Sequence, residues 1–380
     1  MANVKLSNVI RRAQTKVDKD DTDLVFYVGG EHIESENIRV HSRGIIAEST
    51  IGPMFYYGFK AGDFLLVSRN PHLKKAGLVD FDGICSEKTF VLETANSDVL
   101  LPELLPFVLQ NERFWDYAYR HRHGSTNTFI NWSTLANYEF ELPDLETQRK
   151  LAEVLWSIND TMEAYKNLIS ATDELVKSQF MEQFGDPSNN VYGYPVTTLK
   201  EVAVGPLSYG SVSSATEFDG ITRYVRITDI MDDGNLGRDI KSATKTEAKY
   251  LLHEGDILFA RTGATVGKTC RYRENYGRAI YAGFLIRLIP DTTLIDPDYL
   301  YHFTKSDYYW DFVRSAQRVV AQPNINAQEY GDLQILLPKI EAQKSFAAFV
   351  QQSDKSKFEL EQALVELNAT YKRIIAENLG

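Results

Sequence analysis

The sequence predicts an α+β protein made of two similar mixed α/β domains and two long helices. One reason is a stretch of helical periodicity that begins soon after Pro143. A second is the return of the same pattern after Pro338, 195 residues later. The tryptophans Trp115 and Trp310 are separated by the same 195 residues. A constant offset over such a distance indicates an internal duplication, in which each copy holds a globular part followed by a long helix.

The first helix is expected in residues 143–186, where Gly185 and Pro187 supply the usual stop signals. Its apolar side chains recur at alternating steps of three and four residues, which is the spacing of a coiled-coil seam. The predicted seam of this helix consists of Leu155, Ile158, Met162, Tyr165, Ile169 and Val176. The seam of the second helix, in residues 338–380, consists of Leu360, Leu364, Leu367 and Ile374. Because the duplication implies a pseudo-twofold axis, we expect the two helices to pack antiparallel as a coiled coil.

The predicted globular domains are residues 1–142 and 187–337, and each mixes short strands with short helices. The expected elements are a helix at residues 4–12, strands at 24–28, 62–68, 84–93 and 255–259, and helices at 100–119 and 298–316. The loops that follow the corresponding strands differ between the copies, since residues 70–75 and 262–268 share no pattern. One frame with two different loop sets is typical of two versions of the same binding task.

The composition narrows the class of protein. At 380 residues with 43% apolar residues, two to three domains with proper cores are expected. We expect no membrane span and no signal peptide, and Cys85 and Cys270 are too few for a disulfide scaffold, so a cytoplasmic protein is indicated. The net charge of −11 argues against a polyanion partner only superficially, because residues 142–194 alone carry nine acidic and four basic residues.

One stretch resembles a phosphate-binding loop. Gly263 and Gly267 precede Lys268 and Thr269, but three residues separate the glycines where a P-loop has four. The residues after Thr269 also look like a strand rather than a helix. A hairpin turn with glycines at positive φ is therefore the preferred interpretation. No nucleophile elbow, catalytic triad or Gly-rich cofactor loop stands out, so the chain shows no catalytic apparatus of its own.

Two sets of short motifs, in the same order in each copy, carry a resemblance to a known family. They are Gly124-Ser125-Thr126, Phe129-Ile130-Asn131 and Leu142-Pro143-x-Leu145-Glu146-x-Gln148, then Gln322, Asn324-Ile325-Asn326 and Leu337-Pro338-x-Ile340-Glu341-x-Gln343. In these motifs and in its duplication the chain resembles the specificity subunit of type I restriction–modification systems, over its full length.

The resemblance implies that residues 1–142 and 187–337 are target-recognition domains, each reading one half of a bipartite sequence in double-stranded DNA. The helices would space the domains and dock methyltransferase subunits, two in number, and restriction subunits would join through the complex. Adenine methylation with S-adenosylmethionine and DNA cleavage with ATP and Mg²⁺ would belong to those partners. This chain would be non-catalytic, with no cofactor and no metal of its own.

Basic residues in or beside the divergent loops are the candidates for contacts to DNA. They are Arg69, Lys74, Lys75, Arg122, Arg261, Lys268, Arg271 and Arg318. Solvated surface charge is the alternative for each of them. At the level of the whole chain, two other functions stay open: an interaction scaffold without a role on DNA, and a P-loop enzyme, which the short glycine spacing disfavours.

Overall fold

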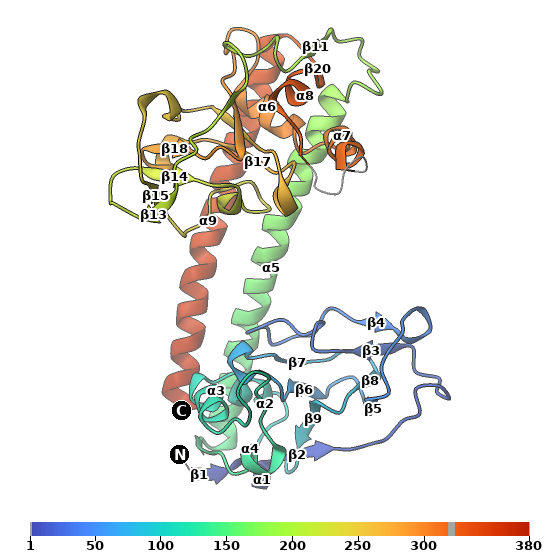
Figure 1. The fold of residues 1–380 in the computed structure, drawn as a ribbon. Coiled ribbons are helices and arrows are strands. Elements are labelled where there is room, and N and C mark those ends of the chain that lie inside the picture. Colours follow the sequence, from blue (N-terminus) through green and yellow to red (C-terminus); the bar gives the residue numbers. More distant parts are fainter. Residues whose placement is uncertain (1, 318–323, 380) are drawn as a thin grey trace. The chain divides into compact units, whose positions relative to one another are not determined.

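The computed structural model describes residues 2–317 and 324–379, and the chain divides into two units. Unit 1 consists of Met1–Lys166 and Glu361–Gly380, and unit 2 consists of Asn167–Leu360. Each unit combines short strands and helices with parts of the two long helices, α5 (Leu145–Phe184) and α9 (Ile340–Asn378) (Figure 1). The predicted α+β class is therefore confirmed.

Unit 1 contains two four-stranded sheets and one two-stranded sheet. Its strands are β1 (Ala2–Lys5), β2 (Ile10–Ala13), β3 (Phe26–Val28), β4 (Gly44–Ile45), β5 (Phe55–Phe59), β6 (Phe64–Val67), β7 (Ala76–Leu78), β8 (Gly83–Ser86), β9 (Thr89–Thr94) and β10 (Glu139–Leu142). The strand orders are β2-β9-β6-β7, β4-β3-β8-β5 and β1-β10. All neighbours pair antiparallel except β3 and β8, which are parallel.

The helices of unit 1 pack on one large core. They are α1 (Leu6–Val9), α2 (Leu105–Leu109), α3 (Glu112–Arg120) and α4 (Trp132–Leu135), together with the first turns of α5 and the last turns of α9. The Phe107 ring centroid lies 5.0 Å from that of Trp156 on α5 and 6.0 Å from that of Tyr371 on α9. The C-terminal residues belong to the same core: Leu379 is buried in it, and its backbone oxygen accepts a hydrogen bond of 2.8 Å from Asn111 Nδ2.

Unit 2 repeats this arrangement with its described strands in one four-stranded sheet and three two-stranded sheets. Its strands are β11 (Val196–Thr198), β12 (Ser208–Tyr209), β13 (Ala215–Glu217), β14 (Arg223–Val225), β15 (Lys241–Ala243), β16 (Ile257–Ala260), β17 (Thr269–Arg271), β18 (Ala279–Tyr281), β19 (Leu285–Leu288) and β20 (Gln334–Leu336). Its helices are α6 (Pro297–Phe303), α7 (Asp307–Gln317) and α8 (Ala327–Gly331), joined by the last turns of α5 and the first turns of α9. Phe180 and Phe184 of α5 pack against Phe346 of α9, with ring centroids 5.5 and 5.6 Å apart.

The duplication is visible in the topology. The sheet order β2-β9-β6-β7 of unit 1 corresponds to β12-β19-β16-β17 of unit 2, and the parallel pair β3-β8 corresponds to β14-β18. In unit 1 the beginning of α5 packs with the end of α9, and in unit 2 the end of α5 packs with the beginning of α9. The two helices therefore run antiparallel within each unit, as predicted (Figure 1).

Four predicted elements differ from the structure. Residues 4–12 form the end of β1, the short helix α1 and the start of β2, because two edge pairings compete with the helix. The expected helices at 100–119 and 298–316 are each broken in two; in the first, Asn111 caps α3 by accepting a hydrogen bond from Arg113 N. Residues 84–93 form two strands, β8 and β9, on either side of a turn.

The stretch that resembled a P-loop is a hairpin between β16 and β17. Gly263 and Gly267 have φ of 74° and 86°, and the residues after the loop enter β17. A P-loop would lead into a helix whose N-terminus faces the phosphates, so this backbone does not supply that geometry. None of the helices within residues 2–317 and 324–379 has both the length and the apolar composition needed to cross a bilayer.

Candidate nucleic-acid interface

The same hairpin carries most of the predicted basic residues in both units. In unit 1, Arg69 follows β6, and Lys74 and Lys75 precede β7. In unit 2, the corresponding hairpin of β16 and β17 carries Arg261, Lys268 and Arg271. Arg122 lies in the loop after α3, and Arg318 falls outside the described residues. The duplicated frame therefore brings six of the eight candidates to equivalent hairpins.

Lys74 and Lys75 of unit 1 are engaged within the protein. Lys74 Nζ lies 2.6 Å from Glu112 Oε2 and 3.0 Å from Glu36 Oε1. Burial lowers the pKa of Lys74, but its hydrogen bonds to Glu112 and Glu36 outweigh this, so the pKa is raised overall. Lys75 Nζ donates a hydrogen bond of 2.6 Å to the Gly30 backbone oxygen. Both side chains thus help to hold the hairpin in place.

The charges around Lys74 continue onto the C-terminal helix. Lys372 of α9 lies 3.0 Å from Glu36 Oε2 and 3.6 Å from Glu112 Oε1. A cavity of about 50 Å³ lies between these side chains, Asn111 and Tyr371. Two lysines and two glutamates with complementary charge thereby fasten α9 to unit 1, which is a structural role.

The two arginine candidates of unit 1 differ in exposure, since Arg69 is exposed and Arg122 is half-buried. The Arg69 side chain is exposed, and its backbone forms a β-bridge with Phe129. The Arg122 guanidinium carbon lies 3.6 Å from the centroid of the Tyr119 ring, a cation–π geometry. His123 and Phe129 exchange two backbone hydrogen bonds, which close the loop around the Gly-Ser-Thr motif. Arginine and exposed aromatic rings therefore meet at this end of β6.

Two of the unit 2 candidates form ion pairs. Arg271 is 11% exposed, and its Nε and terminal nitrogen lie 3.1 Å from Asp298 Oδ1 and 3.2 Å from Glu254 Oε1. Burial raises the pKa of Asp298, against the opposing charges of Arg271 and of Arg273. Lys268 Nζ lies 2.6 Å from Asp232 Oδ1 and lowers the pKa of that carboxyl by hydrogen bonding. Arg271 is therefore part of the interior, whereas the partner of Lys268 is a solvent-exposed carboxylate.

Arg261 is held differently from the other candidates. Its Nε donates a hydrogen bond of 3.1 Å to Asn324 Oδ1, and its guanidinium carbon lies 4.7 Å from the centroid of the Tyr209 ring. Its backbone nitrogen donates to Phe284 O, and its backbone oxygen accepts from Ile325 N. Within the described residues, the two terminal nitrogens of Arg261 have no hydrogen-bond or ion-pair partner.

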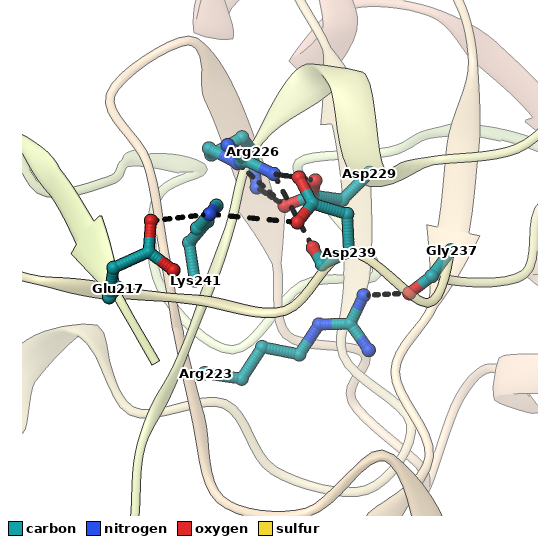
Figure 2. Close-up of polar contacts among 7 residues, drawn as sticks. All are labelled: Glu217, Arg223, Arg226, Asp229, Gly237, Asp239 and Lys241. Atoms are coloured by element: carbon teal, nitrogen blue, oxygen red, sulfur yellow. Dashed lines mark hydrogen bonds and ion pairs between the residues drawn. The ribbon is translucent and has the colours of Figure 1, made fainter. Parts of the chain in front are cut away.

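A second group of charges in unit 2 was not predicted from the sequence (Figure 2). Arg226 pairs with Asp229 at 2.5 Å and with Asp239 at 3.0 Å, and Lys241 pairs with Glu217 at 2.8 Å. The hydrogen bonds that the Arg226 side chain donates to Asp229, and the one to the Asp239 carboxylate, raise the pKa of Arg226. Figure 2 shows the Asp239 carboxylate between Arg226 and Lys241, with Glu217 on the other side of Lys241, so this network braces the segment between β14 and β15. Only the Arg226–Asp229 spacing of three residues was visible in the sequence.

The predicted seam residues all lie on covered sides of α5 and α9. Leu155 is part of the unit 1 core and Val176 part of the unit 2 core, and Ile374 packs against the unit 1 core. The others are half-buried, namely Ile158, Met162, Tyr165, Ile169, Leu360, Leu364 and Leu367. Their assignment to one continuous seam stays a prediction.

The described residues offer no alternative centre for metal or thiol chemistry. Residues 2–317 and 324–379 contain no group of three or more His, Cys, Asp or Glu side chains placed to hold a metal ion. Cys85 and Cys270 are buried, and burial raises the pKa of each thiol to about 12. Because the thiolate is the reactive form, both cysteines are inert packing residues.

Comparison with known proteins shows what this chain is similar to. Residues 194–368 match the family model of the type I restriction modification DNA specificity domain. Over 132 residues the chain is 25% identical to the type I restriction enzyme HindI specificity subunit of Haemophilus influenzae. The match spans 33% of this chain and 28% of that relative.

Two solved structures share the fold over nearly the whole chain. The S subunit of a type I restriction–modification system from M. genitalium has a TM-score of 0.60 at 14% identity, covering 98% of this chain and 94% of that one. A chain from a study of assembly and conformational transition in a type I R-M system has a TM-score of 0.57 at 19% identity, covering 99% and 97%. The resemblance to type I specificity subunits is thereby confirmed.

Proposed function

We propose that this protein is the DNA-recognition subunit of a type I restriction–modification complex. The observation that carries the proposal is the repetition of one frame. The sheet and hairpin of unit 2 lie within the matched specificity domain, and unit 1 has the same strand order outside it. Residues 1–142 and 187–337 would then be two target-recognition domains, each reading one half of a split sequence in double-stranded DNA.

The two units share one backbone frame but would recognise different DNA sequences. The hairpins that carry the basic residues have equivalent backbones but different side chains, since Arg69 stands where unit 2 has Thr262. A rigid scaffold with variable loops is the usual way in which proteins change what they bind. Phosphate contacts would fix the position on DNA, and side chains at the base edges would give sequence.

We propose that other subunits of the complex carry out the catalytic reactions. This chain would dock two methyltransferase subunits through its long helices, and restriction subunits would join through the complex. S-adenosylmethionine, ATP and Mg²⁺ would bind to those partners, and the complex would act in the cytoplasm, where the genome lies. The reaction would be adenine methylation, with cleavage of DNA when restriction subunits are present.

A chimeric protein tests whether each unit reads its own half-site. We expect that exchanging residues 69–75 and 121–129 for those of another specificity subunit changes one half-site in the methylated motif. The other half-site and the spacer should stay as they are. The measurement is genome-wide methylation sequencing of cells that carry the chimera with its methyltransferase subunits. A change in both half-sites would contradict modular reading.

The main alternative is a helical scaffold without a role on DNA. It leads to a different result in a binding titration of the unmodified complex. A DNA-recognition subunit should lose affinity with rising salt, because phosphate contacts release counterions, and should prefer one duplex sequence over others. A scaffold should show no sequence preference at any salt concentration, and that result would remove the proposal.

A further inference from the structure

Arg261 of unit 2 is half-buried and held on one side, while its terminal nitrogens have no partner among the described residues. Asn324 accepts a hydrogen bond of 3.1 Å from its Nε, and the Tyr209 ring covers one face of the guanidinium group. Tyr209 is itself held, because its hydroxyl accepts a hydrogen bond of 3.0 Å from Ala327 N. Two anchors from different elements therefore restrain an arginine that would otherwise sample many rotamers.

Other basic residues of unit 2 differ from Arg261 because a carboxylate lies next to each of them. Arg226 and Arg271 are paired with carboxylates, and Lys268 lies beside Asp232. For Arg261, one nitrogen is used by a neutral amide and no carboxylate lies within ion-pair distance among the described residues. The positive charge of Arg261 is consequently not neutralised inside that part of the chain.

The equivalent position of unit 1 has the same backbone and a different side chain. Ile325 N donates a hydrogen bond of 2.9 Å to Arg261 O, just as Ile130 N donates one of 2.9 Å to Ser68 O. The Ser68 hydroxyl turns inward and donates to Lys88 O at 2.7 Å. The frame therefore does not require an arginine here, and the arginine of unit 2 has no acidic partner among the residues that the structure describes.

Exposed apolar side chains accompany Arg261 at this edge. Phe284, whose backbone oxygen accepts from Arg261 N at 3.1 Å, is 60% exposed. Val212 is 96% exposed, and its neighbour Ser211 accepts a hydrogen bond of 2.7 Å from Gly283 N. Apolar groups of this kind, beside an uncommitted arginine, suit a surface that meets base edges, where thymine offers a methyl group.

We propose that Arg261 reads a guanine in the half-site bound by unit 2. With Nε bound to Asn324, the two terminal nitrogens form a fork that matches O6 and N7 of guanine in the major groove. Asn324 and Tyr209 are positioning residues that hold this fork. The inference rests on the proposed function and names one residue and one base for it.

The test compares Arg261→Lys and Arg261→Ala in the complex with its methyltransferase subunits. Lysine keeps the charge but has no planar fork. We expect Arg261→Lys to keep affinity for non-specific DNA and its salt dependence, while one guanine of the motif becomes degenerate. Arg261→Ala should lower specific affinity by roughly 5- to 150-fold, the range of one bidentate contact. Asn324→Ala should relax the same position to a smaller extent.

Two controls make the outcome decisive. The half-site read by unit 1 is an internal control, because it should stay unchanged in every variant. Arg314→Ala, which removes a surface arginine paired with Asp311 on α7, should leave the whole motif unchanged. Two results would show that Arg261 contacts a phosphate instead. One is that Arg261→Lys retains the preference for guanine. The other is that Arg261→Ala weakens binding to all DNA sequences equally and lowers the slope of the salt dependence by about one. If the unmodified complex shows no sequence preference, the proposed function itself fails.

Discussion

At the scale of single residues, Gln148 and Gln343 do the same task in the two units. Gln148 donates from Nε2 to Val99 O at 2.8 Å and to Pro143 O at 2.9 Å, and its Oε1 accepts from Leu101 N at 3.0 Å. Gln343 makes the same three bonds to Leu294 O, Pro338 O and Asp296 N, at 3.1, 2.8 and 2.8 Å. The two glutamines are 1% and 0% exposed. Each therefore ties the start of a long helix to its globular part.

We expect Gln343→Ala to lower the free energy of unfolding of the protein by roughly 2–3 kcal/mol, because it leaves buried polar groups without partners. Gln343→Glu should cost more at neutral pH, since a carboxylate would face two carbonyl oxygens. Gln351→Ala, an exposed position on the same helix, should change the free energy of unfolding by less than about 0.5 kcal/mol. Urea unfolding followed by circular dichroism measures all three. Equal effects of Gln343→Ala and Gln351→Ala would show that the buried hydrogen bonds are not stabilising.

At the scale of elements, the two long helices are parts of the globular cores rather than linkers. In unit 2 the Phe346 ring of α9 is fully buried against Phe180 and Phe184 of α5. At a level nearer the middle of the helices, Lys357 of α9 forms an ion pair with Asp173 of α5. Aromatic packing supplies most of the stability here, because a half-exposed ion pair contributes little.

Phe346→Ala should therefore destabilise unit 2 by about 3–5 kcal/mol, the usual cost of emptying a buried aromatic site. Phe358→Ala on the same helix removes a ring that is 59% exposed and should cost less than about 0.5 kcal/mol. Thermal melting of the two variants beside the unmodified protein makes the comparison. A small effect of Phe346→Ala would mean that the helices associate with unit 2 by other contacts.

At the scale of the whole molecule, α5 and α9 each contribute residues to both units. A continuous helix rises about 1.5 Å per residue, and DNA advances about 3.4 Å per base pair. If the helices set the spacer between half-sites, lengthening both should lengthen the spacer. The Asp173–Lys357 pair shows which levels of the two helices must be extended together.

We expect four residues inserted after Thr172, with four more after Lys357, to give a methylated motif with the same half-sites and a spacer longer by one or two base pairs. Four residues are about one helical turn, so the apolar face stays nearly in phase. Methylation sequencing reads the spacer directly. Recovery of the original spacer from a folded, active insertion variant would show that the helices do not set the distance. Lower activity alone decides nothing, because rotation of one domain around DNA can also reduce it.

Periodicity and repetition made the long helices and the duplication predictable. Pro143 and Gly185 mark the start and end of α5 to within two residues, because local chemistry decides both. The pairing of charges was not predictable in the same way. Lys74 meets Glu36, and Arg271 meets Asp298, only after the chain has folded. The same reason applies to Arg261, whose anchor Asn324 is 63 residues away.

The offset of 195 residues does not predict which residues of α5 and α9 contact each other. It equates Thr172 with Leu367, which occupy the same place in their respective copies. The contact at the level of Thr172 is made by Lys357, through Asp173. Repetition in sequence identifies equivalent residues, whereas an antiparallel arrangement brings different residues together. The sites of two matched insertions therefore have to be chosen from the Asp173–Lys357 ion pair and not from the sequence offset.

The place of Leu379 in the unit 1 core has a consequence for how the protein is made. Chains fold as they leave the ribosome, with N-terminal domains usually completed first. Here Ile375 and Leu379 complete the core around Phe107, and Asn111 binds the Leu379 backbone. The core of unit 1, whose N-terminal part emerges first, therefore cannot be completed until all of unit 2 has been translated. Part of its apolar surface stays uncovered until then. Unit 2 is continuous in sequence, so its core does not depend on a segment that lies beyond the other unit.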